Sequence, residues 1–549
     1  MTGQPALYIH KLSFRYRDRP EPTLKDLSLE VPAGELLLLA GASGSGKTTL
    51  IRCINGLIPR SYKGEVVGSL RLHGEETRSM HLSHISQIVG TVLQDPERQI
   101  LGSRVRNEVA FGLENLGMER KEILLRIDEA MKFLDIEHLS QRETFSLSGG
   151  EKQKVALAGV LAMRPSILLL DEPLASLDPA SAQETLVIVR QLCDAGMTVL
   201  IVEHRVEDVL SIQPNRVMFL EDGHTCYLGS VEGLYKVVNY REIKVPASII
   251  IERAANIPAA PEILFTPLGK NGKPPLVCFE DVGFGYDQEL EVLHGINLQI
   301  NRGDVIAVLG PNGAGKTTLV KHAIGLLKPK SGRVMVNGKD THEQSIAQIA
   351  STLGYVFQSP SHMLFETTVN KELSFGPKNL GHLPDEITQE VAQAVQIVHL
   401  EGREEDPPLS LSFGQQKRTS IAAILAMRSK ILIMDEPTAG QDYRNYMDFM
   451  DAILQMPGFE AILFITHDVD LAVIYANRVL LVNEGRLVAD GSPQEVLRDE
   501  NRLRENRLVP TSLLRINLEL FSQTGRFLRA EALAHAKASN QSSPLVGSS

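Results

Sequence analysis

Short apolar runs recur along the chain and predict buried strands. They occupy residues 35–40, 167–172, 198–203, 304–309, 431–436 and 461–466. Continuous apolar character of this kind is typical of strands covered on both faces. The segments between these runs have the character of helices, so the pattern predicts a mostly parallel sheet flanked by helices. Ahead of this pattern, alternating stretches at Leu7–Val31 and Val277–Ile300 predict an antiparallel strand region.

The two halves of the chain carry the same pattern. Lys47 and Lys316 lie 269 residues apart, and most later motifs keep a spacing of 264 residues, or 263 at His204 and His467. The change from 269 to 264 places five extra residues of the first half within residues 57–68. A match of this length indicates an internal duplication whose unit is too long for a solenoid.

The duplicated unit extends past the last shared motif, because Val245–Ile250 matches Val509–Leu514. Each of these segments has proline at its second position and predicts a short helix. The join between the halves is typical of an exposed linker, and the Ser/Asn-rich end predicts disorder. We therefore expect six regions: a first domain at 1–236, its helical extension at 237–256, a linker at 257–275, a second domain at 276–500, its helical extension at 501–537 and a disordered tail at 538–549.

Composition narrows the class of protein. The 549 residues are 43% hydrophobic and 22% charged, which is ordinary for a globular protein of several domains, and the net charge of −11 argues against nucleic acid as a partner. The four scattered cysteines predict neither a disulfide framework nor a zinc site. No apolar run approaches the roughly 20 residues that cross a bilayer, and Met1–His10 lacks the pattern of a signal peptide. Work at a membrane would therefore need a partner.

Two of the predicted strands lead into the phosphate-binding pattern G-x-x-x-x-G-K-[ST]. The matches are Gly41–Thr48 and Gly310–Thr317, and each opens a predicted helix. The glycines let backbone N–H groups turn toward phosphate oxygens, and the helix N-terminus adds partial positive charge. In this pattern the lysine reaches the β- and γ-phosphates and the next threonine holds Mg²⁺; these residues are Lys47 with Thr48 and Lys316 with Thr317.

Two other apolar runs end in paired acids, Asp171–Glu172 and Asp435–Glu436. A carboxylate at the end of such a strand can orient the Mg²⁺ shell, which is the role expected of the two aspartates. The glutamate that follows can polarise the attacking water as a general base. Solvated acids at a strand end are the alternative, and the phosphate loop in each half favours the catalytic interpretation.

A serine-led turn, called the signature turn below, stands before a predicted helix in each half. It spans Leu147–Glu151 in the first half and Leu411–Gln415 in the second, and the first helix is expected to start near Lys152. A Ser-Gly-Gly turn before a helix is a second anion site by the same N-terminal argument. An ordinary helix cap is the alternative, because serine is a common N-cap.

Together these motifs resemble the ATP-binding-cassette (ABC) family over about 500 of the 549 residues. The resemblance adds a Q-loop glutamine, an H-loop histidine, an adenine-stacking tyrosine and a D-loop in each half. These are Gln94 and Gln358, His204 and His467, Tyr16 and Tyr286, and Ser176–Asp178 and Gly440–Asp442. Structural histidines and packed aromatics remain the alternatives for the histidines and tyrosines. The matching positions in both halves favour the functional interpretation.

The resemblance implies an α/β fold of two tandem P-loop NTPase cassettes. Each would be a mostly parallel sheet flanked by helices, with an antiparallel β subdomain and a helical subdomain, followed by a short helical extension. In this family two cassettes pack head to tail, and each ATP lies between the phosphate loop of one and the signature turn of the other. The cassettes close when ATP binds and reopen after hydrolysis, and this movement drives any protein docked on them.

Carried over residue by residue, the resemblance implies the following site, with ATP and Mg²⁺ as cofactors. Lys47 would share a site with Ser412, Phe413 and Gly414, and Lys316 would share one with Ser148, Gly149 and Gly150. Catalytic residues would be Glu172, Glu436, His204, His467, Gln94 and Gln358. The ATP would also contact Tyr16, Gly41, Ala42, Ser43, Gly44, Ser45, Gly46, Thr48, Thr49, Tyr286, Gly310, Pro311, Asn312, Gly313, Ala314, Gly315, Thr317 and Thr318. The Mg²⁺ residues would be Thr48, Gln94, Asp171, Thr317, Gln358 and Asp435.

Two positions depart from the family pattern. Phe413 stands where the second signature turn usually has glycine, and Glu151 replaces a frequent glutamine in the first. A bulky Phe413 would crowd the γ-phosphate or require a shifted backbone, which makes the Lys47 site the weaker one. Because both halves keep the glutamate and the histidine, we expect both sites to hydrolyse ATP, but unequally.

Three stretches resemble the ATPases of energy-coupling-factor importers, which take up vitamins, vitamin precursors, or cobalt and nickel. They are Asn55–Gly68, Gln94–Gly117 and Gln358–Gly381. The fused two-cassette form resembles most the subgroup for thiamine or hydroxymethylpyrimidine. In this branch the segment after the Q-loop glutamine grips a coupling helix of the membrane subunit, and Asp95 and Glu97 in the first half are candidate contacts, with Ser359 and Ser361 in the second.

The function expected is therefore that of the ATP-hydrolysing subunit of a membrane importer. It would lie peripherally on the cytoplasmic face of the cell membrane and bind integral membrane subunits through the segments after Gln94 and Gln358, with a separate substrate-binding membrane protein and possible self-association. A fused sugar-importer ATPase is one alternative, although one of its cassettes is usually more degenerate than either half here. A tandem-cassette ATPase acting on ribosomes is another, although the long charged linker and cysteine cluster of such proteins are absent from this sequence.

Overall fold

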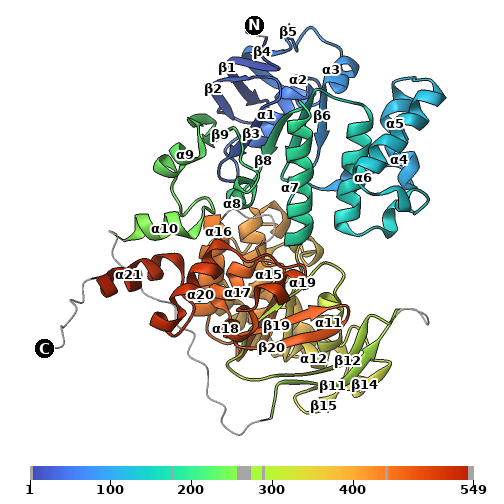
Figure 1. Ribbon diagram of the computed structural model, residues 1–549. Coiled ribbons are helices and arrows are strands. Elements are labelled where there is room, and N and C mark those ends of the chain that lie inside the picture. The colour runs from blue at the N-terminus through green and yellow to red at the C-terminus, as the bar shows by residue number, and fades with distance from the viewer. Residues whose placement is uncertain (1–3, 176, 256–273, 287–290, 439–442, 542–549) are drawn as a thin grey trace, which may run out of the picture. The chain divides into compact units, whose positions relative to one another are not determined.

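The computed structural model describes residues 4–175, 177–255, 274–286, 291–438 and 443–541. The chain divides into two compact units (Figure 1). Unit 1 holds the residues up to Ile249, and unit 2 holds nearly all residues from Ile250 onward. Each unit contains a four-stranded antiparallel sheet and a six-stranded, mostly parallel sheet.

The small sheet of unit 1 has the order β2-β1-β4-β5 and the large sheet the order β10-β9-β3-β8-β7-β6. Only the β9–β10 pair of the large sheet is antiparallel. The strands are β1 (Leu7–Tyr16), β2 (Leu24–Val31), β3 (Leu36–Ala40), β4 (Gly64–Leu72), β5 (Glu75–Glu76), β6 (Val89–Val92), β7 (Ile167–Asp171), β8 (Thr198–Val202), β9 (Arg216–Glu221) and β10 (His224–Gly229).

Unit 1 contains helices α1 to α9 and the first residues of α10, and α4, α5 and α6 form a separate helical group (Figure 1). The helices are α1 (Lys47–Ile54), α2 (Leu57–Arg60), α3 (Leu82–Ile88), α4 (Val105–Asn115), α5 (Arg120–Phe133), α6 (Gly149–Ala162), α7 (Pro179–Asp194), α8 (Val206–Leu210), α9 (Val231–Val237) and α10 (Ala247–Ala254). Short 3₁₀ turns are η1 (Pro96–Arg98), η2 (Glu137–Leu139) and η3 (Thr144–Ser146).

Unit 2 repeats both sheets, with the orders β12-β11-β14-β15 and β16-β17-β18-β13-β19-β20. Its strands are β11 (Val277–Phe284), β12 (Leu293–Ile300), β13 (Val305–Leu309), β14 (Ser331–Val336), β15 (Lys339–Asp340), β16 (Leu353–Val356), β17 (Ile431–Asp435), β18 (Ala461–Ile465), β19 (Arg478–Asn483) and β20 (Arg486–Gly491). As in unit 1, the last strand pair is antiparallel and the other pairs of the large sheet are parallel.

The helices of unit 2 include a group of α13, α14 and α15 around its own apolar cluster. The helices are α11 (Lys316–Ala323), α12 (Ile346–Ala350), α13 (Val369–Leu380), α14 (Pro384–Ile397), α15 (Phe413–Ala426), α16 (Tyr443–Gln455), α17 (Val469–Tyr475), α18 (Pro493–Val496), α19 (Glu500–Glu505), α20 (Ser512–Thr524) and α21 (Ala530–Gln541). The 3₁₀ turns are η4 (Thr341–Glu343), η5 (Pro360–His362) and η6 (Pro408–Ser410).

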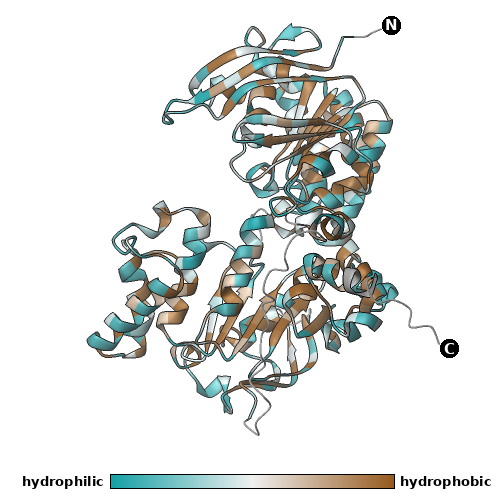
Figure 2. Ribbon diagram, turned by 90° about the vertical axis from the view of Figure 1, so that its left-hand side faces the viewer, coloured by the Kyte–Doolittle hydropathy of each residue, from teal (hydrophilic) through white to brown (hydrophobic). Residues whose placement is uncertain are grey.

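Burial explains why the apolar runs become the central strands. All five residues of β3 and all five of β13 are buried, because neighbouring strands cover their edges and helices and the small sheet cover their faces. Figure 2 shows apolar residues concentrated on these strands in each unit. The phosphate loops and the paired acids therefore sit at the carboxyl edge of a fixed sheet, where ligands bind in open α/β sheets.

The predicted α/β arrangement is confirmed in both halves, including the antiparallel region before each phosphate loop and a helical extension in each half. α10 begins one residue after Pro246 and α20 two residues after Pro510. Most of the linker expected at 257–275 lies outside the described residues, as do Ser176 and Gly440–Asp442 of the expected D-loops. α21 runs to Gln541, so a helix covers the first four residues of the tail expected to be disordered, and 542–549 lie outside the description.

Candidate nucleotide sites

The phosphate loop of unit 1 curls tightly between β3 and α1. Gly46 has a left-handed backbone (φ 105°) directly before α1, a conformation that favours glycine. A Cβ at Gly41 would lie 2.4 Å from the carbonyl oxygen of Leu220, so no larger residue fits there without a shift. The buried Lys47 ammonium donates to the carbonyl oxygens of Gly41 and Ala42, at 2.8 Å each. The loop thus holds the lysine ammonium group at the start of α1.

Unit 2 builds the same loop between β13 and α11. Gly315 has a left-handed φ of 96°, and Lys316 donates to the carbonyl oxygens of Gly310 and Pro311 at 2.7 Å each. The side chain of Lys316 is buried like that of Lys47. The two lysine ammonium groups therefore make equivalent hydrogen bonds in two loops of different sequence, since the pattern residues set the backbone path.

The paired acids of unit 1 stand beside the loop. The Glu172 carboxylate accepts hydrogen bonds from Gln94 Nε2 at 2.7 Å and lies 2.8 Å from His204 Nε2. Burial opposes ionisation of Glu172, but the bonds from His204 and Gln94 outweigh it and lower the pKa of this carboxyl. Burial, with the charge of Glu172, raises the pKa of Asp171 to about 6. The structure thus brings together the predicted glutamine, glutamate and histidine of the first half.

In unit 2 the acids have partly different neighbours. His467 Nδ1 lies 2.9 Å from the Glu436 carboxylate, whereas among the described residues Gln358 makes no side-chain hydrogen bond with it. Thr317 Oγ1 donates to Asp435 Oδ2 at 3.1 Å, which joins the phosphate loop to the strand end. Burial raises the pKa of Asp435. The two halves therefore share the glutamate–histidine pair but not the position of the glutamine.

The backbone at Glu172 and Glu436 is a feature that sequence reasoning missed. Both residues have a left-handed φ, 50° and 44°, directly after their strands. For a non-glycine residue this conformation is unfavourable and costs of order 1 kcal/mol or more. It turns each glutamate sharply off the strand end, where His204 and His467 meet the carboxylates. A glutamate at such a position carries no sequence signal of its strain.

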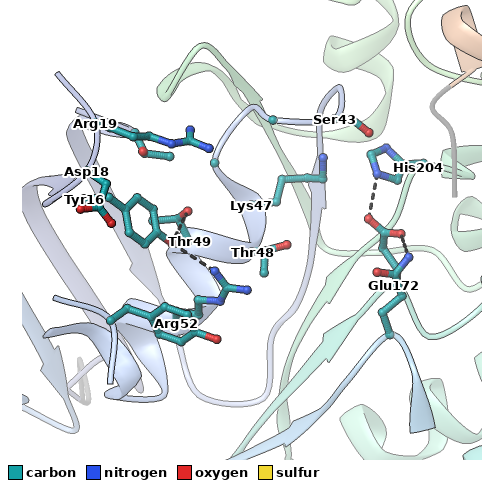
Figure 3. Close-up of a pocket in the computed structure, with 15 residues that line it drawn as sticks. Tyr16, Asp18, Arg19, Ser43, Lys47, Thr48, Thr49, Arg52, Glu172 and His204 are labelled. Atoms are coloured by element: carbon teal, nitrogen blue, oxygen red, sulfur yellow. Dashed lines mark hydrogen bonds and ion pairs between the residues drawn. The ribbon is translucent and has the colours of Figure 1, made fainter. Parts of the chain in front are cut away.

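A cavity of about 550 Å³ in unit 1 contains most of these groups (Figure 3). Lys47 and Thr48 lie in its middle, Glu172 and His204 on one side, and Tyr16 and Arg52 on the other. The predicted site residues that line it are Tyr16, Ser43, Gly44, Gly46, Lys47, Thr48, Thr49, Gln94, Glu172 and His204. Residues not predicted also line it: Asp18, Arg19, Thr23, Arg52 and Tyr62.

The tyrosines near the phosphate loops are tied to the helices that follow. Tyr16 Oη lies 3.2 Å from Thr49 Oγ1, and Tyr286 Oη lies 3.3 Å from Thr318 Oγ1. In unit 1 the guanidinium of Arg52 also donates to Tyr16 Oη and lies 4.2 Å from the ring centre of Tyr62. Tyr62 belongs to the segment that carries the five extra residues of the first half. The aromatic side of this cavity is thus built partly from the segment in which the two halves differ in length.

The signature turns form helix caps in both units. Ser148 caps α6 and Ser412 caps α15, each through a reciprocal bond with the third helical residue, Glu151 or Gln415. α6 starts at Gly149 rather than near Lys152, so the predicted start is three residues too late. Among the described residues that line the cavity of unit 1, none belongs to its own signature turn. Capping and anion binding are compatible, because the serine side chain accepts from the N–H of the third helical residue and does not use the first two N–H groups of the helix.

The ring of Phe413 lies against the ammonium group of a lysine that the sequence did not single out. The Lys417 ammonium lies 5.1 Å from the Phe413 ring centre and donates to the carbonyl oxygen of Pro437, the residue after Glu436. Burial lowers the pKa of Lys417 to about 7. One side chain thus connects the second signature turn with the loop that carries the candidate general base of unit 2.

The donors beside each phosphate loop suit a hard divalent cation such as Mg²⁺. A threonine hydroxyl and an aspartate carboxylate stand together in unit 2, where Thr317 bonds Asp435. In unit 1 the Oδ1 atom of Asp171 is buried and has no hydrogen-bond partner among the described residues. Oxygen ligands of this kind, few in number, are typical of Mg²⁺ sites that also use phosphate oxygens. These residues therefore fit the cation that the phosphate loop implies.

Two P-loop units, each with a glutamate–histidine pair at its sheet edge, define a tandem nucleotide-hydrolysing protein. The model of the ABC transporter family matches residues 24–175 and 293–439. The chain belongs to the ABC transporter family and is an ATP-hydrolysing transporter ATPase. The family's ATPases bind ATP and act with membrane transporter subunits.

Relatives match nearly the whole length. The relatives carry the name ABC transporter ATP-binding protein. They include one from Clostridium perfringens (35% identity, 94% of this chain, 96% of the relative), one from Vibrio vulnificus (34%, 94%, 95%) and one from Methanosarcina mazei (35%, 94%, 94%). A solved structure of CbiO1 from Clostridium perfringens, described as part of the transporter complex CbiONQ, has 36% identity and a TM-score of 0.39 and covers 42% of this chain and 94% of that one.

Proposed function

We propose that this ATPase powers a membrane importer of the energy-coupling-factor type for a vitamin, a vitamin precursor or a transition-metal ion. The proposal rests on the resemblance of Asn55–Gly68, Gln94–Gly117 and Gln358–Gly381 to that branch. The observation that carries it is a matched pair of exposed apolar surfaces beside the two Q-loop segments. No helix among the described residues is long and apolar enough to cross a bilayer. Membrane work then depends on partner subunits, with the ATPase held peripherally on the cytoplasmic face.

The docking surface of unit 1 consists of Leu93, Leu101, Phe111 and Phe145, all exposed. Leu101 is 70% exposed, although large apolar side chains are usually covered. Thr144, the neighbour of Phe145, joins this residue to the segment after Leu101, because its hydroxyl donates to the carbonyl oxygen of Gly102 at 2.7 Å and its N–H to that of Ser103 at 3.1 Å. Exposed apolar side chains on joined segments favour an apolar partner such as an amphipathic coupling helix.

Unit 2 repeats this surface at equivalent positions, with Phe357, Phe365, Phe375 and Leu409. The rings of Phe365 and Phe375 pack edge to face, 4.8 Å apart. Each residue lies 264 positions after its counterpart in unit 1. Two similar surfaces support docking of two coupling helices, one for each unit.

Charge distinguishes the two docking surfaces. In unit 1 the Asp95 side chain caps η1 and lies 3.3 Å from Arg98, and Glu97 pairs with Lys152. The Asp95–Arg98 pair is largely exposed, so it is worth about 0–1 kcal/mol, and the exposed carboxylates of Asp95 and Glu97 are accessible to a basic group on a partner. In unit 2 the corresponding Ser359 and Ser361 bond each other at 2.8 Å. We propose a charged contact for unit 1 and a neutral one for unit 2.

ATP is proposed to bind between the units in the manner of the family. Lys47 and Lys316 then bind the phosphates, and the signature turns, Ser412–Gly414 and Ser148–Gly150, complete the opposite sites. Mg²⁺, held by Thr48 with Asp171 and by Thr317 with Asp435, would neutralise charge on the phosphates. Glu172 and Glu436 would orient and deprotonate the attacking water, while His204 and His467 fix these carboxylates through the bonds described.

The direct test is to isolate the tagged full chain in mild detergent and identify what accompanies it. Integral membrane subunits together with a small vitamin-like molecule or metal ion are expected. Co-sedimentation with ribosomes would contradict the proposal, and a sugar in the preparation would point instead to a sugar importer.

The double variant Asp95→Asn/Glu97→Gln should keep ATP hydrolysis but lose about tenfold in transport. Ser359→Ala/Ser361→Ala is the matched control in unit 2, with little loss expected; equal transport in both variants would refute the charged contact.

A further inference from the structure

One hydrogen bond distinguishes the two strand-end aspartates. The Tyr355 hydroxyl donates to Asp435 Oδ2 at 2.7 Å, and Thr317 Oγ1 donates to the same oxygen at 3.1 Å. Short O–H···O⁻ bonds of this kind are among the stronger hydrogen bonds in proteins. The carboxylate of Asp435 is therefore held from two sides, by the phosphate loop and by a neighbouring strand.

The sheet register explains why Tyr355 reaches the aspartate. On β16 it lies opposite Ile433 of β17, and Ile433 and Asp435 share one face of the sheet because side chains alternate along a strand. The Tyr355 ring also packs edge to face on Phe357, with 4.8 Å between ring centres. Tyrosine is long enough to span the remaining two residues along the neighbouring strand. The bond is thus a consequence of register and side-chain length.

Unit 1 lacks this bond although its register is the same. Thr91 lies opposite Leu169 of β7, the position equivalent to Tyr355, but its hydroxyl is too short to reach Asp171. The Thr91 hydroxyl instead accepts a bond from Asn55 Nδ2 at 3.4 Å. Among the described residues, Asp171 Oδ1 has no hydrogen-bond partner. Thr48 interacts with the Asp171 carboxyl as Thr317 does with Asp435, so the Tyr355 bond is the difference between the two aspartates.

We propose that Tyr355 is a positioning residue for the divalent cation of unit 2, acting through Asp435. By fixing one carboxylate oxygen, the phenol orients the group before the cation and nucleotide arrive, and unit 2 binds the cation more tightly than unit 1. Groups that orient a cation's ligands commonly change metal affinity by 10- to 100-fold when removed. This inference rests on the proposed role of Asp435 in holding Mg²⁺.

The test measures cation binding directly. In the full chain carrying Lys47→Ala, which weakens the phosphate loop of unit 1, Mn²⁺ binding in the presence of ATP is followed by the electron paramagnetic resonance signal of free Mn²⁺. Adding Tyr355→Phe keeps the ring packing and removes only the hydroxyl. It should weaken Mn²⁺ binding by about tenfold, while the affinity for ATP in excess chelator stays within twofold, a split that general structural damage would not produce.

The matched control is Thr91→Val in a chain carrying Lys316→Ala, in which unit 1 is observed. Mn²⁺ binding there should stay within twofold, because Thr91 does not touch Asp171. Unchanged Mn²⁺ affinity in Tyr355→Phe, or an equal loss of ATP affinity without cation, would overturn the inference. If the unsubstituted chain bound ATP no better with Mn²⁺ than with chelator, the proposed role of Asp435 itself would be wrong.

Discussion

Glu172 and Glu436 occupy equivalent positions in the two repeats but have different surroundings. Glu172 is bonded by Gln94 and His204, whereas Glu436 is bonded by His467 among the described residues. The signature turn proposed to face the Lys47 site carries Phe413 where glycine is usual. Identical catalytic residues are thus placed in unequal sites, and the difference lies in their neighbours rather than in the residues themselves.

We predict unequal effects from removing the two candidate general bases. Glu172→Gln and Glu436→Gln should each lower hydrolysis at their own site by about 10²-fold or more. The rate of the whole chain should fall further in Glu436→Gln, because Phe413 already slows the site that contains Glu172. Steady-state phosphate release of both variants and the parent chain measures this. Equal residual rates would show that Phe413 does not weaken its site.

A second residue-scale prediction concerns Glu203, which is buried at the end of β8 beside His204. Burial raises the pKa of Glu203 to about 8, and its Oε1 accepts a bond from the Leu174 N–H at 2.8 Å. The folded chain therefore keeps this proton up to about pH 8, whereas an unfolded glutamate loses it near pH 4.3. Between these values the folded state binds more protons, so the free energy of unfolding should fall as pH rises.

Glu203→Gln keeps an acceptor for Leu174 and removes the titration. It should flatten the dependence of stability on pH between about 5 and 8 and stabilise unit 1 by roughly 1–3 kcal/mol at pH 8. Thermal unfolding of the parent and variant across this range measures the effect, with the exposed Glu232→Gln as control. A variant whose stability still falls with pH as steeply as the parent's would show that Glu203 is ionised in the folded chain.

At the scale of elements, one buried side-chain amide joins the two helices in the extension of unit 2. Asn517 on α20 donates to the carbonyl oxygens of Leu513 at 3.0 Å and Leu528 at 2.9 Å, and accepts from the Leu528 N–H at 2.6 Å. Leu528 precedes α21, so Asn517 fixes the turn between the two helices. Arg529, the next residue, forms an ion pair with Asp451 of α16.

We predict that Asn517→Ala loosens this extension. The substitution leaves the Leu528 N–H and carbonyl without their partner, which should cost about 2–4 kcal/mol of local stability. Hydrogen exchange should then speed up in α20 and α21 and stay unchanged in β13 and β18, since such openings are local. The exposed Ser522→Ala on the same helix serves as control. Exchange that rises across all of unit 2 would mean that the extension is part of the unit's cooperative core.

The elements that sequence predicts well are those with local signals. The phosphate loops, the six buried runs and the paired acids follow from short patterns, and each lies where expected. The start of α6 is missed by three residues although the Ser148–Glu151 spacing of a capping box marks it. The bond from Tyr355 to Asp435 joins residues 80 positions apart and depends on strand register, so no local pattern contains it. The contact of Lys417 with Pro437 joins a helix to a loop 20 positions further along the chain, so no local pattern contains it either.

At the scale of the whole molecule, duplication followed by divergence gives two units with one plan and different details. Each unit has its own apolar core, so each can respond separately to heat or denaturant. The proposed arrangement makes ATP the link between them, because each nucleotide would contact both units. Stability measurements can therefore test where ATP binds without any knowledge of the transported substrate.

We predict that ATP couples the unfolding of the two units. Without nucleotide, calorimetry of the Glu172→Gln/Glu436→Gln chain should show two transitions. With Mg²⁺ and ATP at about 100 times the dissociation constant, each transition should gain about 2.7 kcal/mol and the two should merge. Lys47→Ala/Lys316→Ala should show no such change. If Lys47→Ala alone abolished the ATP-induced shift of one transition and left the other fully shifted, each nucleotide would be bound within a single unit, and the shared sites proposed here would be wrong.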